Sequence, residues 1–201
     1  MHGSNVNCIG GYTMEFFCEI CQYTEKLKAA LDGIDQTAVN QLMNLLLETR
    51  NAGKQIYIMG NGGSAATASH FVGDFNKGLS LGKEKRFRFI CLCDNTPVVM
   101  SLANDVAYED IFVEQLKNFL SPGDVVIGIS GSGNSENVIR AARYAKGKGN
   151  PVVAFTGYDG GKLLPLADLC LHVNVDDMQI VEDVHMVFNH MMYSVLSHVN
   201  D

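Results

Sequence analysis

Residues 56–75 read IYIMGNGGSAATASHFVGDF. The apolar run over residues 56–59 is typical of a buried strand, and it breaks at the glycines of residues 60–63. A helix is expected to begin at Ser64. A strand that passes through glycines into a helix is the first half of the unit from which parallel sheets are built.

The rest of the chain repeats this alternation of strand and helix. Two amphipathic helices precede the first strand, from Tyr12 to about Leu31 and from about Asp35 to Asn51. Strands are predicted at residues 54–60, 87–93, 124–130, 151–157 and 169–175, and the later helical segments at residues 98–106, 110–120, 136–149 and about 179–198. Short strands separated by helices predict a parallel sheet that is covered on both faces.

We therefore predict one α/β domain over residues 1–201, with a helical pair in residues 1–52 and an α/β core in residues 53–201. The core is expected to be a three-layer, doubly wound parallel sheet of the flavodoxin-like kind. The helical pair and the apolar C-terminal helix carry more apolar surface than a peripheral element needs. They either cover another subunit or pack on their own sheet, and the sequence leaves both interpretations open.

Composition excludes several classes of partner. The net charge of −7 provides no basic surface for nucleic acid or for an anionic membrane. No apolar run reaches the length of about 18 residues that a membrane span needs, and no signal peptide is recognisable. The protein is expected to be cytoplasmic. Cys18 and Cys21 have no second such pair to complete a zinc site, so the cysteines are interpreted as reduced thiols that mostly serve packing.

Two glycine-rich turns are predicted where a strand meets a helix. The first is the glycine turn, residues 60–64, and the second is the serine loop, residues 130–135, which reads SGSGNS. Neither matches the dinucleotide-binding pattern or the lysine-containing P-loop. Three serine hydroxyls, with glycines that let the backbone N–H groups approach, suit a phosphate monoester. The alternative is an ordinary capped turn.

Histidines and carboxylates form a second candidate site. His70 and Asp74 are four residues apart on the predicted helix, so their side chains share one face. The last helix offers Glu182, His185 and His190, and either histidine could reach the same cavity. Imidazoles with a carboxylate suit a divalent metal, with zinc, nickel and manganese all compatible. The alternative is a surface pair with packing histidines, and His185 is expected in the core or supporting the site.

The motifs together resemble a known family. The pairing of GNGGSAATASHF (60–71) with GISGSGNSENVIRAARYAKGKG (128–149), with TGYDGGKL (156–163) and VEDVHMVFNH (181–190), resembles the sugar isomerase (SIS) domain family and, within it, the phosphoheptose isomerases. The resemblance covers essentially the whole chain. It implies conversion of sedoheptulose 7-phosphate to D-glycero-D-manno-heptose 7-phosphate, in a homotetramer with active sites between subunits.

The resemblance also implies roles for individual residues. The serine loop would hold the phosphate, and the glycine turn and an Asn-Asp pair would contact the sugar. The residues concerned are Ser130, Gly131, Ser132 and Ser135 for the phosphate, and Asn61, Gly62, Gly63, Ser64, Asn104 and Asp105 for the sugar. The related isomerases commonly carry Thr at the position of Gly131. Without the resemblance, the Asn-Asp pair is an ordinary helix end.

For the metal, the resemblance implies the ligand set His70, Asp74, Glu182 and His190, with zinc as the expected ion. Asp74 stands where the family has Glu, and Glu182 stands where it has Gln. The expected chemistry is aldose–ketose isomerisation through an enediolate, with Asp74 or Glu182 as the base and His190 as the acid. The rival interpretations are a non-catalytic adaptor that binds a replication initiator protein and a phosphosugar-binding regulatory module.

Overall fold

The computed structural model describes residues 15–199, in which one sheet of five parallel strands has the order β2-β1-β3-β4-β5. The strands are β1 (Ile56–Met59), β2 (Phe89–Cys91), β3 (Val125–Ser130), β4 (Val152–Gly157) and β5 (Leu169–Val173). The strand order reverses between β1 and β3. In sheets of this kind, ligands bind in the crevice at the carboxyl ends of the two strands where the order reverses.

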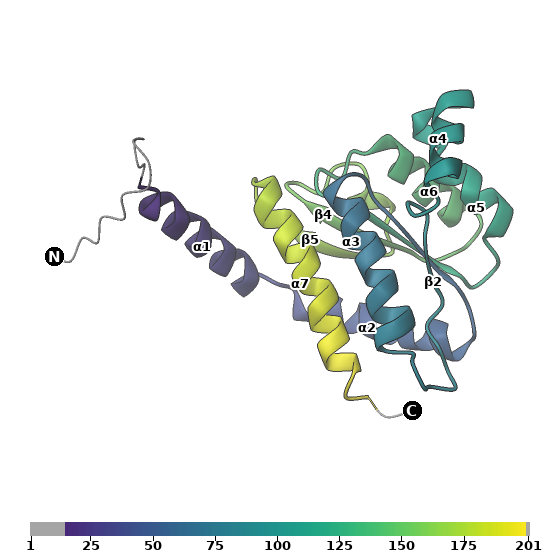
Figure 1. Cartoon of the computed structure of the whole chain (residues 1–201), viewed down its shortest axis with the longest axis horizontal. Helices are drawn as coiled ribbons and strands as arrows, with labels where there is room; N and C mark the ends of the chain where they lie inside the picture. Colours follow the sequence, from purple (N-terminus) through teal and green to yellow (C-terminus); the bar gives the residue numbers. More distant parts are fainter. Residues whose placement is uncertain (1–14, 200–201) are drawn as a thin grey trace, which may run out of the picture.

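Alternating side chains of β1 divide the core into two layers. Ile56 and Ile58 belong to one buried cluster, and Tyr57 and Met59 belong to another on the opposite face of the sheet. The first face is covered by α2 (Gln36–Asn51), α3 (Gly63–Val72) and α7 (Met178–Leu196), and the second by α5 (Val113–Phe119) and α6 (Glu136–Gly147). The predicted three-layer α/β fold is confirmed (Figure 1).

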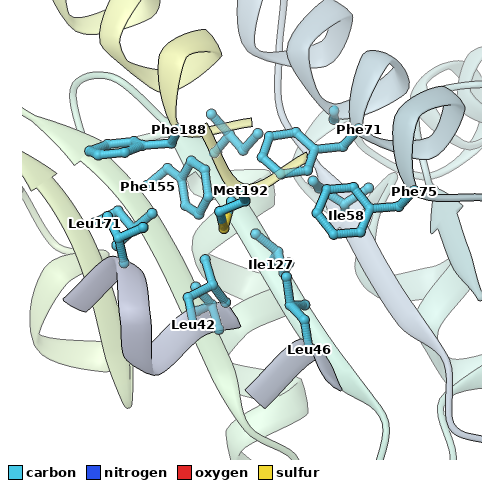
Figure 2. Packing of buried hydrophobic residues seen from close by; sticks show 14 of the residues in the cluster. Leu42, Leu46, Ile58, Phe71, Phe75, Ile127, Phe155, Leu171, Phe188 and Met192 are labelled. Carbon is cyan, nitrogen blue, oxygen red and sulfur yellow. The ribbon is translucent and has the colours of Figure 1, made fainter. Parts of the chain in front are cut away.

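The first layer is a continuous apolar core. Figure 2 shows Phe188 and Met192 of α7 and Phe71 of α3 packed around the sheet residues Ile127 and Phe155. The rings of Phe71 and Phe155 meet edge to face, with centroids 5.7 Å apart. This packing fixes α3 and α7 next to each other, and these helices carry the histidines of the candidate metal site.

Helix α1 (Phe17–Asp32) extends away from the sheet (Figure 1). The predicted start of this helix at Tyr12 lies outside the described residues. Phe17 is 73% exposed and Ile20 is 60% exposed. The prediction that the cysteines mostly pack is wrong for Cys18 and Cys21, since both are exposed on α1. The reason is that α1 contacts the body mainly near its C-terminal half.

Two predicted segments differ most from the structure. The strand predicted at residues 87–93 is only β2. The side-chain amide of Asn76 binds both the N–H and the C=O of Phe89, at 2.9 and 2.8 Å. The side chain thus caps the open edge of the sheet. The helix predicted at residues 110–120 is a 3₁₀ turn over Tyr108–Asp110, followed by α5. Helix α4 (Thr96–Asp105) precedes them.

None of the helices within residues 15–199 combines the length and the apolar character that crossing a membrane requires.

His185 of α7 is a core residue. It is 1% exposed, its Nε2 lies 3.3 Å from the carbonyl oxygen of Thr156, and its Nδ1 has no hydrogen-bond partner in the described chain. Burial lowers the pKa of His185 to about 4. The imidazole is therefore neutral in the folded protein well below the pH at which an exposed histidine is protonated.

We expect this burial to make the protein acid-sensitive. As the pH falls below about 6.5, the unfolded chain binds a proton at His185 and the folded chain does not, so the free energy of unfolding falls until the pH reaches about 4. The loss amounts to about 3 kcal/mol. Urea unfolding between pH 7 and pH 4 should show this loss in the wild type, reduced by that amount in His185→Leu. The exposed His198→Ala should keep the wild-type pH dependence, and an identical slope for His185→Leu would contradict the expectation.

Candidate active site

The serine loop follows β3 and leads into α6, so it lies in the crevice that the strand order defines. Ser130 is buried, and its hydroxyl donates to Oγ of Ser135 at 3.1 Å. Ser135 occupies the N-cap position of α6, but its side chain makes no capping hydrogen bond. The first N–H groups of α6 and the positive end of its dipole are thus directed toward the loop, which is an arrangement that binds phosphate.

A second turn, residues 157–161, supports the serine loop. The carbonyl oxygen of Gly133 accepts a hydrogen bond from Leu163 N at 2.9 Å, and Oδ1 of Asn134 accepts one from Lys162 N at 3.3 Å. Gly133 has a φ of 64°, and a Cβ atom there would lie 2.0 Å from the carbonyl oxygen of Gly160. The close approach of the two turns therefore requires glycine at position 133.

Met178 lies against the glycine at position 131. A Cβ atom on Gly131 would lie 2.5 Å from Sδ of Met178, so a larger residue here requires the flexible methionine side chain to move. Met178 also lines an open cleft of about 550 Å³, which Ser132 and Asn134 border as well. The exposed side of the serine loop thus faces a space of the size that small ligands occupy.

The glycine turn joins β1 to α3 and is tied to the beginning of α6. Asn61 and Asn137 exchange two hydrogen bonds between their side-chain amides, each 2.9 Å long, and the Tyr108 hydroxyl donates to Oδ1 of Asn61 at 2.9 Å. Gly62 has a φ of 55° and occupies the N-cap position of α3 without a side-chain cap. The predicted phosphate and sugar sites are therefore neighbours, held together by one amide pair.

His70 and Asp74 lie where α3 changes its helical form. Helix α3 ends at Val72 and continues as a π-helical segment, η1 (Gly73–Gly78), so Asp74 is on a π turn rather than on the predicted α-helix. Such turns are frequent at functional sites. The two side chains still share one face, with Nε2 of His70 3.3 Å from Oδ2 of Asp74.

His190 of α7 completes a group of three. Its Nε2 lies 3.0 Å from Nε2 of His70, and the candidate ligand atoms of His70, Asp74 and His190 all lie within 4.8 Å of one another. We call these three residues the His-Asp-His cluster. Within residues 15–199, no other group of three or more His, Cys, Asp or Glu side chains brings its ligand atoms so close together.

The His-Asp-His cluster fits a divalent metal. Nitrogen and oxygen ligands of tetrahedral zinc lie about 2.0–2.2 Å from the ion, which places them about 3.3 Å from one another. The His70–His190 and His70–Asp74 separations of 3.0 and 3.3 Å are close to this value, and the ligand atoms of Asp74 and His190 lie within 4.8 Å of each other. Three protein ligands leave one position for water or substrate, as in catalytic zinc sites. The same donors also accept nickel or manganese.

Within residues 15–199 of one chain, Glu182 lies outside the His-Asp-His cluster, and its predicted place in a four-residue ligand set stays a prediction. Glu182 and His190 are eight residues apart on one helix, so they are separated by about 12 Å along its axis. The carboxylate instead lies against Gly63, where a Cβ atom would be 2.7 Å from either of its oxygens. It thus faces the positive N-terminus of α3, beside the glycine turn.

Asn104 and Asp105 lie at the C-terminal end of α4, on the side of the molecule away from α7 (Figure 1). Both are exposed, and Nδ2 of Asn104 donates to Oδ1 of Asp105 at 2.7 Å. Within this chain, the pair is therefore not next to the His-Asp-His cluster. Its predicted contact with sugar stays a prediction.

Sequence reasoning missed two buried asparagines at the site. Asn137 is 2% exposed and holds Asn61, and Asn189 is fully buried and donates to Oδ2 of Asp74 at 2.7 Å. Asn189 immediately precedes His190 within the apolar stretch of the last helix, and an amide among apolar residues was the available signal. Polar side chains in such positions need a partner, and the partner was Asp74.

The fold and the two turns define an SIS domain, and the chain belongs to this family: the sequence model of the family matches residues 22–157. Within the family, the chain belongs to the branch of the phosphoheptose isomerases. It is 37% identical over 174 residues to the phosphoheptose isomerase of Helicobacter pylori (strain P12), with 87% of this chain and 90% of the relative covered.

Two further relatives agree with this placement. The probable phosphoheptose isomerase of Thermoplasma acidophilum is 40% identical over 146 residues, which cover 73% of this chain and 80% of that protein. The solved structure of the phosphoheptose isomerase from Neisseria gonorrhoeae is similar with a TM-score of 0.84 and 27% identity, over 92% of this chain and 100% of the other. The similarity thus extends over the fold and over nearly the full length of the relatives.

Proposed function

We propose that this protein is a phosphosugar isomerase that converts sedoheptulose 7-phosphate to D-glycero-D-manno-heptose 7-phosphate. The observation that carries the proposal is the presence of both a serine loop at the β1–β3 crevice and a His-Asp-His cluster on α3, η1 and α7, in a member of the phosphoheptose isomerase branch. A phosphate site alone would suit a binding module, whereas the cluster supplies groups that move protons.

The serine loop binds the phosphate in this proposal. Ser130, Ser132 and Ser135 donate hydroxyl hydrogen bonds, and the N-terminus of α6 adds N–H groups and a positive dipole. The protein has an overall negative charge, so these local donors attract the anion in place of a basic surface. Holding the phosphate fixes one end of the sugar and directs the reacting carbons toward the helices that carry the histidines.

The reaction moves one proton between neighbouring carbons. A base removes a proton from C1 of the ketose and returns it to C2, while the proton of the C1 hydroxyl passes to the oxygen on C2. His190 acts as the acid at that oxygen when its Nε2 is not bound to a metal. A divalent ion held by His70, Asp74 and His190 would supply polarisation of the carbonyl oxygen.

Two carboxylates remain candidates for the base, Asp74 and Glu182. Oδ2 of Asp74 already lies close to His70 and accepts a hydrogen bond from Asn189. Glu182 is outside the His-Asp-His cluster and faces the glycine turn, which favours it as the base when Asp74 serves the metal.

We also propose that the chain works as a homotetramer with sites between subunits. The exposed apolar side chains at the beginning of α1 support this assembly, because Phe16, Phe17 and Ile20 are not covered by any part of residues 15–199. Light scattering on the purified protein measures the assembly, and a monomer at working concentration would contradict it.

The experiment that tests the function is an isomerisation assay with sedoheptulose 7-phosphate, on metal-stripped protein and again after addition of zinc. We expect no turnover in the stripped protein and recovery with zinc. Equal turnover in both conditions would support the isomerase function and contradict a requirement for metal. No turnover in either, from folded protein, would contradict the proposed reaction, and binding to a replication initiator protein would then identify the adaptor.

A further inference from the structure

Asn189 is a polar side chain in the apolar interior of α7. It has no exposed surface, and the residues one turn before and one turn after it, His185 and Met192, are buried as well. The amide nitrogen donates to Oδ2 of Asp74 at 2.7 Å. The amide oxygen is buried and has no hydrogen-bond partner in residues 15–199.

This arrangement does not favour stability. A buried carbonyl oxygen without a partner loses its hydrogen bonds to water and gains none from the protein. A leucine at position 189 would fill a similar volume without that penalty. Asp74 is 25% exposed, so its carboxylate can obtain water as a donor if the amide is removed. Stability therefore gives no reason for an asparagine here, and another reason is required.

The hydrogen bond acts on the orientation of Asp74. The donor on Asn189 and the imidazole of His190 come from consecutive residues of α7, so they approach Asp74 from its buried side and from its exposed side. The same oxygen, Oδ2, lies 3.3 Å from Nε2 of His70. Because Asp74 has a short side chain on a π turn, one strong hydrogen bond from a rigid helix is enough to fix the rotation of its carboxylate.

We propose that Asn189 is a positioning residue that holds the carboxylate of Asp74 in the orientation that the His-Asp-His cluster needs to bind a divalent metal. This inference rests on the proposed function, because it concerns the same cluster. Hydrogen bonds from outside a metal's ligand set typically change metal affinity by about 10- to 100-fold. Asn189 thus lowers the stability of the fold, but it holds Asp74 in the orientation that metal binding needs.

The test compares Asn189→Leu with the wild type and with Met192→Leu, a buried substitution on the same helix that makes no polar contact with Asp74. Zinc affinity is measured by calorimetry on metal-stripped protein, and the thermal midpoint is measured on the same samples without metal. We expect Asn189→Leu to bind zinc about 10- to 100-fold more weakly. Its thermal midpoint should be unchanged or higher, and Met192→Leu should keep the wild-type affinity.

Cobalt(II) provides a second readout, since its visible absorption bands report the coordination geometry. The bands should change in Asn189→Leu and not in Met192→Leu. If a folded Asn189→Leu variant binds zinc with wild-type affinity, the inference about Asn189 is overturned, while the proposal of a metal site is unaffected. A lower thermal midpoint with unchanged affinity would show a structural role instead. Absence of zinc binding by the wild type would overturn the metal site, and this inference with it.

Discussion

Replacing His190 with Ala is expected to reduce turnover of sedoheptulose 7-phosphate by at least about 1000-fold, because loss of a general acid alone costs about 10²- to 10⁴-fold. The same change removes one of the three donors of the His-Asp-His cluster. His190 is on α7 and the serine loop follows β3, so the phosphate site is untouched. Binding of sedoheptulose 7-phosphate, measured by calorimetry, should therefore stay within a few-fold of the wild type.

The matched control is His198→Ala, which removes an exposed histidine just after the same helix. It should leave both turnover and binding unchanged. Unimpaired turnover in His190→Ala would eliminate the proposed role of this histidine. Loss of substrate binding together with turnover would show that His190 contacts the sugar in the ground state, and the assignment of binding to the serine loop alone would then be wrong.

Local patterns predicted the fold well where one element determines its own structure. The apolar run of β1 and the glycines after it predicted the first strand–helix unit, and the repetition of that unit along the chain predicted the parallel sheet. The serine loop was found because its residue types report its chemistry without any knowledge of neighbours. His70 and Asp74 were paired because a helical spacing of four survives even where α3 becomes a π turn.

Sites that depend on contacts between distant segments were predicted less completely. Glu182 matches the resemblance by position, whereas the group of ligand atoms within residues 15–199 consists of His70, Asp74 and His190. Asn189 was missed because its partner, Asp74, is 115 residues earlier in the chain. The reciprocal amide pair of Asn61 and Asn137 was missed for the same reason. The periodicity of a single segment does not indicate which distant residue a side chain will contact.

Exposure could not be predicted for α1 either. Its apolar residues recur at helical spacing, which predicts an apolar face but does not say whether that face packs on its own chain. In the structure, Tyr23 donates to Asp183 at 2.6 Å and Lys26 lies 3.3 Å from Asp177, so polar contacts with the region of α7 hold the helix. The apolar residues nearer its beginning remain exposed, which is the arrangement expected of a segment that meets another subunit.

Gly133→Ala is expected to cause the largest loss of stability among single substitutions in the serine loop. The residue has a φ of 64°, and the added Cβ would lie 2.0 Å from the carbonyl oxygen of Gly160. Either the serine loop or the 157–161 turn must move, and the hydrogen bond from Leu163 N to Gly133 O is strained with it. We expect the free energy of unfolding to fall by about 4 kcal/mol or more, at the upper end of single-residue effects.

Gly149→Ala separates the two causes of this loss. Gly149 also has a positive φ, 78°, but nothing lies within 4 Å of a Cβ atom built there. It should therefore cost only the backbone strain, about 1–2 kcal/mol. Denaturant unfolding of both variants gives the comparison, and the difference measures how rigidly the two turns are held together. Equal losses would mean that the turns separate at little cost, and the phosphate site would then be assembled by the ligand rather than formed in advance.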